Sequence, residues 1–247
     1  MKTHTLNNQM QSNLLIVCII FLLFPNTKSF SMLPGKSPQD NNIIQLPAPQ
    51  LSSGVSVEEA MLNRRSIREF KDIALSLEEV SQVLWSAYGI TEERSQPAFL
   101  RGGLRTAPSA GALYPLDIYL AIGNVKGLKA GIYKYISEMH AIELISEGDV
   151  RKDLAKAALD QEFLEQAPVS LVFVAVYSRT TQKYGERGRE RYVCMDLGHS
   201  AQNVYLQTTA MNLGTCAVGA FTDRMVSMSM LLKSEEEPLY IMPIGKY

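Results

Sequence analysis

Apolar side chains recur at helical spacing near the start of the folded part of the chain. In residues 77–88 they repeat every three or four positions, which is typical of an amphipathic helix. Ser76 and Glu79 have the spacing of a capping box, in which a hydroxyl and a carboxylate satisfy free backbone amides at a helix start. Ser56 and Glu59 repeat that spacing, so the pattern predicts two helices in succession.

Alternating and continuous apolar runs predict strands in the rest of the chain. Residues 116–122 alternate apolar and other side chains, as in a strand. Residues 168–176 form a continuous β-rich apolar run, as in a strand covered on both faces. Further strands are expected at 131–136, 141–145, 216–221 and 239–244, further helices at 150–166, 190–211 and about 225–233, and a mobile loop at 91–104. This order predicts an α+β fold with helices on both faces of one sheet.

Residues 1–29 have the pattern of a signal peptide. An apolar run at 14–24 follows Lys2 and is shorter than the about 20 residues that span a bilayer. Ser29 offers a cleavage site, so we expect export to the periplasm or the cell exterior. An uncleaved anchor, which would be the protein's contact with a membrane, and a mis-set start codon, which would leave it cytoplasmic, are the alternatives.

The remaining chain divides into a short segment and one domain. Residues 30–54 carry four prolines among Ser, Gln and Asn, which predicts a linker or a strap lying on the domain. Residues 55–247 are expected to form the domain, since 247 residues with 46% hydrophobic side chains suffice for one core.

The net charge limits which binding partners are expected, and the cysteine spacing limits which metal or disulfide sites are expected. The net charge of −1 and the lack of long basic runs do not suggest nucleic acid, so small molecules and a second copy of the chain are expected. Cys194 and Cys216 lack metal-ligand spacing and are interpreted as two buried thiols, with a disulfide as the alternative if the protein is exported. No metal site is predicted.

Two segments carry the candidate chemistry. Residues 64–70 (RRSIREF) hold three arginines, whose guanidinium groups match phosphate oxygens bidentately. Residues 108–111 (PSAG) form a small-residue turn that lets a ligand approach the backbone. Taken alone, the first segment also fits a solvated basic turn. Together they predict a site for flavin mononucleotide (FMN).

These segments resemble the nitroreductase-like flavoproteins, in particular the branch with the azoline dehydrogenases of thiazole and oxazole peptide biosynthesis. The motifs fall in the expected order over roughly residues 55–247 and are 64–70, 108–112, 183–187 (KYGER), 198–203 (GHSAQN) and 212–214 (NLG). The resemblance implies the nitroreductase fold, with a mixed or antiparallel central sheet, in a homodimer that binds flavin at the subunit interface.

The resemblance also implies roles for individual residues. Arg64 and Arg68 would contact phosphate or ribityl oxygens, and Arg65 and Ser66 would lie against the ring edge and the ribityl chain. The opposite side would be lined by Pro108, Ser109, Ala110 and Gly111, with the backbone of Ala217, Val218 and Gly219 beside the ring. Lys246 could add a cation near the phosphate, although a frayed chain end is an equal alternative.

Lys183 and Tyr184 match the Lys-Tyr pair that azoline dehydrogenases place near the flavin. One of the two would take a proton as hydride leaves the substrate carbon. The simpler interpretation is a charged loop before a helix. His199, within the predicted helix 190–211, is interpreted as structural.

The expected activity is an FMN-dependent oxidoreductase. Because reduced nicotinamide is not normally available outside the cytoplasm, the predicted export favours a dehydrogenase that oxidises an organic or peptide substrate by hydride transfer to flavin. An NAD(P)H-dependent nitroreductase and a non-catalytic FMN-binding protein are the alternatives.

Overall fold

The computed structural model describes residues 42–247. The predicted signal peptide and residues 30–41 of the predicted strap therefore lie outside the described residues. Residues 42–53 run along the domain: residues 43–45 pair with the central sheet, and the Ser81 hydroxyl donates a hydrogen bond to the carbonyl of Pro47 over 2.5 Å.

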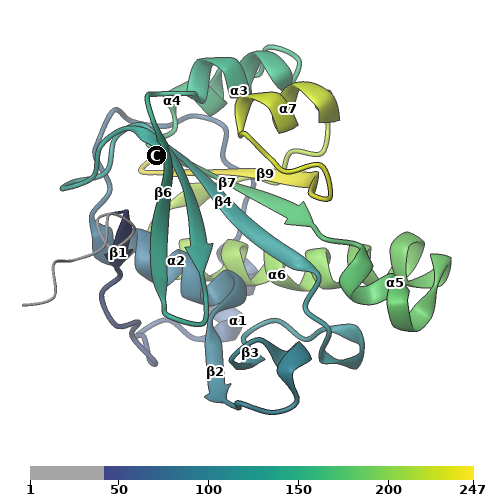
Figure 1. Ribbon diagram of the computed structural model, residues 1–247. Coiled ribbons are helices and arrows are strands. Elements are labelled where there is room, and N and C mark those ends of the chain that lie inside the picture. Colours follow the sequence, from purple (N-terminus) through teal and green to yellow (C-terminus); the bar gives the residue numbers. More distant parts are fainter. Residues whose placement is uncertain (1–41) are drawn as a thin grey trace, which may run out of the picture. The chain divides into compact units, whose positions relative to one another are not determined.

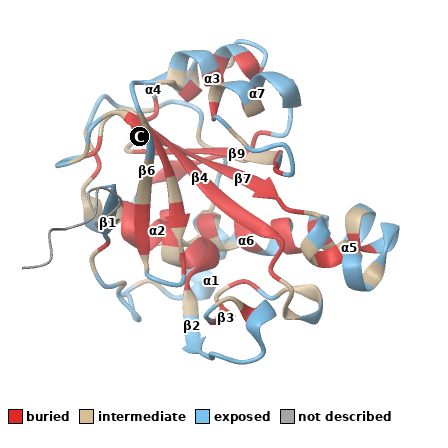
Figure 2. Cartoon of the chain, viewed as in Figure 1, coloured by how far each residue is buried: buried red, intermediate tan, exposed pale blue. Residues whose placement is uncertain are grey.

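The central sheet has seven strands in the order β1-β6-β5-β4-β7-β9-β8, and every pairing is antiparallel (Figure 1). Its strands are β1 (Ile43–Gln45), β4 (Leu116–Ile122), β5 (Gly131–Ile136), β6 (Ala141–Glu147), β7 (Val169–Ala175), β8 (Gly214–Thr215) and β9 (Glu237–Gly245). A separate hairpin pairs β2 (Ile90–Glu93) with β3 (Gly103–Arg105). Both β4 and β7 are buried along their whole length (Figure 2), as expected for central strands.

Helices cover both faces of this sheet. They are α1 (Val57–Asn63), α2 (Leu77–Tyr88), α3 (Arg151–Ala157), α4 (Phe163–Gln166), α5 (Ser178–Tyr184), α6 (Val193–Ala210) and α7 (Asp223–Ser229). Alternate residues of β4 point to opposite sides: Ile118 packs in the core with α2 and α6, whereas Tyr119 packs in the core with α3, α4 and α7. The predicted α+β architecture is confirmed.

Capping explains where the first helices begin. At Ser76 the full capping box is present: the Ser76 hydroxyl accepts from the Glu79 amide, and the Glu79 carboxylate accepts from the Ser76 amide. At Ser56 the hydroxyl accepts from the Glu59 amide.

Three sequence predictions need correction. The helix expected at 150–166 breaks at Leu159 and Asp160, whose φ angles of 59° and 58° leave the helical region. The loop expected at 91–104 contains part of the β2–β3 hairpin and a short 3₁₀ turn (Ala98–Leu100). The strand expected at 216–221 is displaced to β8, with one further bridge between Val218 and Ile241.

The cysteine interpretation was half wrong. Cys216 is buried, but Cys194 is exposed on α6, and neither forms a disulfide. No helix among the described residues is long and apolar enough to cross a membrane.

Candidate active site

The arginine loop, residues 64–70, follows α1 and rests against Tyr205 of α6. The Arg64 guanidinium lies 5.3 Å from the centre of the Tyr205 ring, and the hydroxyls of Ser66 and Tyr205 are 3.1 Å apart. The Tyr205 hydroxyl also accepts a hydrogen bond of 2.7 Å from the amide of Ala217. Tyr205 therefore holds together two segments that the sequence placed at the same site.

The residues of segment 217–219 differ in how far the fold already uses their backbone groups. The amide of Val218 donates to the carbonyl of Ile241, its carbonyl accepts from the Ile241 amide, and its side chain is buried. The amides of Ala217 and Val218 are therefore committed to the fold, whereas Gly219 is exposed.

The arginine side chains keep free hydrogen-bonding capacity. Arg65 donates to the backbone carbonyls of Leu62 and Arg64, and Arg68 is exposed. No carboxylate among residues 42–247 forms an ion pair with the three arginines. Three arginines without acidic partners suit a phosphate group.

Lys246 lies beside this loop, because its carbonyl accepts from the Lys71 amide over 2.8 Å. Its ammonium group forms an ion pair with Glu79, the capping carboxylate of α2. The lysine is in the predicted neighbourhood, but its charge is already balanced.

The Pro-Ser-Ala-Gly turn is fastened to α6 by Asp196. The Ser109 hydroxyl donates to one oxygen of Asp196 over 2.5 Å, and the Ala110 amide donates to the other over 3.3 Å. His199 lies with its Nδ1 atom 3.3 Å from the carbonyl of Pro108, in agreement with a structural role. Burial raises the pKa of Asp196, although the two hydrogen bonds and the charge of His199 act in the opposite direction.

Lys183 and Tyr184 face this turn. Gly111 has a φ of 65°, and a Cβ atom placed on it would lie 2.7 Å from the Tyr184 hydroxyl and 3.1 Å from the Lys183 ammonium. The Lys183 ammonium also lies 5.2 Å from the centre of the Tyr184 ring. The structure thus brings the predicted catalytic pair to the predicted flavin turn, and the lack of a side chain at Gly111 makes this approach possible.

The arginine loop and the turn contact opposite sides of α6. Asp196 and Tyr205 are nine positions apart, and at 3.6 residues per turn that places them about 180° apart around the helix. Two cavities, of about 920 and about 700 Å³, lie beside residues 45–57, and neither is lined by the arginine loop. Neither of these two cavities is shared by the arginine loop and the turn.

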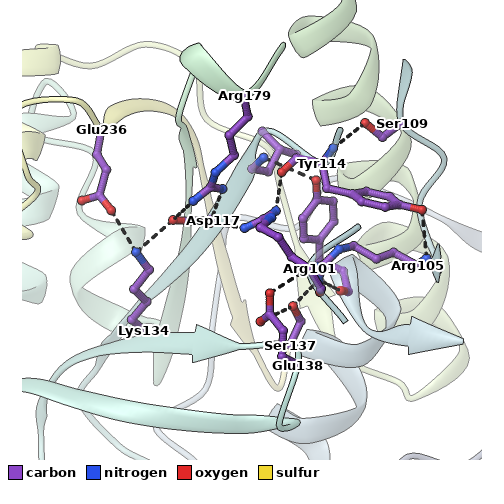
Figure 3. A network of polar contacts seen from close by, with 12 residues as sticks. Arg101, Arg105, Ser109, Tyr114, Asp117, Lys134, Ser137, Glu138, Arg179 and Glu236 are labelled. Carbon is purple, nitrogen blue, oxygen red and sulfur yellow. Dashed lines mark hydrogen bonds and ion pairs between the residues drawn. The ribbon is translucent and has the colours of Figure 1, made fainter. Parts of the chain in front are cut away.

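A buried polar network, which the sequence did not reveal, positions α5. Asp117 of β4 accepts two hydrogen bonds from Arg179 of α5, at 2.6 and 3.0 Å, and pairs with Lys134 at 2.9 Å and Arg101 at 3.4 Å (Figure 3). Lys134 also pairs with Glu236 at 2.9 Å. Burial alone would raise the pKa of Asp117, but the hydrogen bonds and charge of Arg179, together with Lys134, hold it well below its usual range.

The same network reaches the turn. Arg101 donates to the carbonyl of Tyr114, and the Tyr114 amide donates to the Ser109 hydroxyl over 2.9 Å (Figure 3). Asp117 therefore connects the helix that carries Lys183 and Tyr184 with the turn that they face.

Comparisons with known proteins agree with this geometry. Residues 61–246 match the sequence model of the "Nitroreductase family". The chain belongs to the nitroreductase family. It is 45% identical over 207 residues to "Putative nitroreductase MJ1384" of Methanocaldococcus jannaschii, covering 84% of this chain and 98% of the relative.

Two further likenesses are informative. A crystal structure of a "putative nitroreductase" from Ralstonia eutropha superimposes with a TM-score of 0.71 at 32% identity, covering 83% of this chain and 89% of that one. The "Microcin B17-processing protein McbC" of Escherichia coli is 26% identical over 163 residues, which span 64% of this chain and 57% of McbC. The predicted resemblance is confirmed, and the McbC match fits the azoline dehydrogenase-type branch.

Membership of the nitroreductase family makes the chain an oxidoreductase of a flavoprotein family. The sequence missed Asp117, Asp196 and Tyr205 of this site. A single polar residue inside an apolar pattern was the available signal, and it does not distinguish a buried partner from a solvent-facing residue. Among the described residues no cluster of His, Cys, Asp and Glu could hold a metal ion.

Proposed function

We propose that this nitroreductase-family chain is an FMN-dependent dehydrogenase that oxidises an organic or peptide substrate. The observation that supports it most is the approach of Lys183 and Tyr184 to Gly111, which sets a base beside the turn predicted to hold the flavin. The McbC likeness adds a relative whose name describes processing of microcin B17, and thereby favours a peptide.

The chain's residues supply binding and proton transfer. Arg64 and Arg68 would hold phosphate or ribityl oxygens, Arg65 and Ser66 would contact the ring edge and ribityl chain, and residues 108–111 would line the other side. FMN, when bound, would supply the acceptor for the hydride that leaves the substrate carbon. Lys183 or Tyr184 takes the proton released from the neighbouring substrate atom, so that a single bond becomes a double bond.

A second copy of the chain completes the site in this proposal. The arginine loop and the turn face opposite sides of α6, so the loop of one subunit meets the turn of its partner. Exposed apolar side chains on α1 and α6 could be buried in such a contact: Val57, Met61, Leu62 and Met195 are 59%, 58%, 73% and 55% exposed.

The competing candidate is an NAD(P)H-dependent nitroreductase, favoured by the name of the M. jannaschii relative. It differs in its electron donor, because the flavin would be reduced by nicotinamide and not by the substrate that loses hydride. Rapid bleaching of the flavin by NADPH, with turnover of nitroaromatics, would favour this candidate.

The proposal predicts that Lys183→Met and Tyr184→Phe stay yellow but oxidise substrate slowly. Loss of a general base typically costs about 10²–10⁴-fold in rate. The probe is a synthetic thiazoline-containing peptide, with thiazole formation followed by mass spectrometry. Lys152→Met, an exposed lysine on α3, is the control and should match the wild type. A colourless wild type after incubation with FMN, or full activity in both variants, would contradict the proposal.

A further inference from the structure

A surface trough runs beside residues 45–57. Its first part, the cavity of about 920 Å³, lies between residues 45–49, Trp85 of α2, strand β2 and the turn at 137–140. Its second part, of about 700 Å³, lies between residues 48–57, α2 and α6. Ala48 and Trp85 line both parts, so the two cavities are neighbours along one groove.

The trough leads toward the turn of the candidate site. Thr106 and Asn203 line its second part, and the Asn203 side chain donates to the Thr106 carbonyl over 3.2 Å. The Thr106 hydroxyl donates to the carbonyl of Trp85 over 3.1 Å. Thr106 stands two residues before Pro108, so the second part of the trough borders the segment that leads into the turn.

One wall of the trough is the edge of a sheet. Strand β2 pairs with β3, and within residues 42–247 it has no second partner. The outer edge of such a strand carries backbone groups that can pair with an added strand, as in peptide recognition by β-augmentation. Apolar side chains that can receive alternate residues of such a strand lie beside this edge: Trp85, Ile90 and Met139.

Carboxylates outnumber available cations along this wall. Glu93 is exposed and has no ion-pair partner among the described residues. Arg94, the one arginine that lines the trough, is held by Glu92 at 2.6 Å. Glu138 keeps 36% of its side chain exposed, accepts a hydrogen bond from the Ser137 hydroxyl over 3.2 Å and lies 3.3 Å from Arg105. The free charge on the wall is negative.

We propose that this trough binds an extended peptide segment in which apolar and basic side chains alternate. The segment adds to the free edge of β2, places its apolar side chains on Trp85 and its neighbours, and pairs a basic side chain with Glu93. The inference rests on the proposed function in one respect, since the bound segment belongs to the peptide whose oxidation occurs at the turn.

Trp85 provides a direct test, because it is the only tryptophan of the chain and lines both parts of the trough. The FMN-loaded full chain is titrated with a synthetic peptide of alternating valine and lysine, and tryptophan fluorescence is recorded. We expect a saturable change, and an affinity loss of about tenfold in Glu93→Lys, which is about 1.4 kcal/mol. The matched control is Glu165→Lys, which reverses an exposed charge on α4 and should bind as the wild type does.

A flat titration, or equal affinities in Glu93→Lys and Glu165→Lys, would overturn the trough proposal. The same peptide with glutamate in place of lysine should bind at least about tenfold more weakly, and equal binding would also overturn the proposal. The titration needs no turnover. Peptide oxidation without trough binding therefore refutes the trough alone, and trough binding without oxidation refutes the proposed activity alone.

Discussion

Two buried carboxylates of this nitroreductase-family chain have opposite surroundings. Asp117 pairs with Arg179, Lys134 and Arg101, and Arg179 and Lys134 hold its pKa well below the usual range despite burial. Asp196 is only 2% exposed, and burial raises its pKa although a hydroxyl and an amide donate hydrogen bonds to it. The sequence shows both as single acidic residues in apolar patterns, and only the fold determines which one meets cations.

The raised pKa of Asp196 predicts how stability depends on pH. In the folded chain this carboxyl binds its proton more tightly than in the unfolded chain, so its contribution is present at low pH and is lost as the pH rises through the folded pKa. As the pH rises from about 4 to about 7, the free energy of unfolding of Asp196→Asn should therefore increase relative to that of the wild type.

Urea unfolding of both proteins at the two pH values measures this difference. Asp153→Asn, an exposed carboxylate on α3, is the control and should show no such gain. If the difference in stability between Asp196→Asn and the wild type does not change with pH, Asp196 is not the source of the pH dependence.

At the scale of elements, strong periodic patterns correctly predicted which segments form helices and strands. The patterns did not predict where the local backbone breaks an element. The runs behind β4, β7, α2 and α6 bury continuous faces, so their spacing defined them. The break between α3 and α4 arises where Leu159 and Asp160 take positive φ, and the Gln161 side chain then bonds the carbonyls of Ala158 and Ala220. This tertiary contact leaves no trace in the apolar pattern.

The attachment of α5 to the sheet predicts the effect of Asp117→Asn. Removing one partner of a buried ion pair leaves the other uncompensated and costs about 3 kcal/mol or more. We expect that loss in the free energy of unfolding, together with faster hydrogen exchange in α5. Activity should fall as in Lys183→Met while bound flavin is retained, because α5 carries the catalytic pair.

Glu147→Gln is the matched control, because Glu147 forms a surface pair with Lys129 at 2.6 Å and the two side chains are 55% and 73% exposed. Exposed pairs contribute less than about 1 kcal/mol. Equal destabilisation by the two variants, or unchanged exchange in α5 of Asp117→Asn, would contradict a positioning role for the network.

For the whole molecule, the family and fold could be predicted from ordered motifs, but the arrangement of the site could not be derived from one chain's pattern. The motifs place arginines and the small-residue turn in sequence order only. Their contacts with Tyr205 and Asp196, on opposite sides of α6, separate them within one chain. The proposed site therefore depends on the second subunit, which supplies the missing half to each arginine loop.

The most direct test is the flavin content of a mixed dimer. One subunit carries Arg64→Ala and Arg68→Ala, the other carries Pro108→Trp on the exposed face of the turn, and two affinity tags isolate dimers with one copy of each. Each homodimer should be colourless. The mixed dimer should bind about one FMN, against about two for the wild type, because one of its two shared sites is intact. A mixed dimer that binds no FMN, or a protein that forms no dimer, would contradict the shared site.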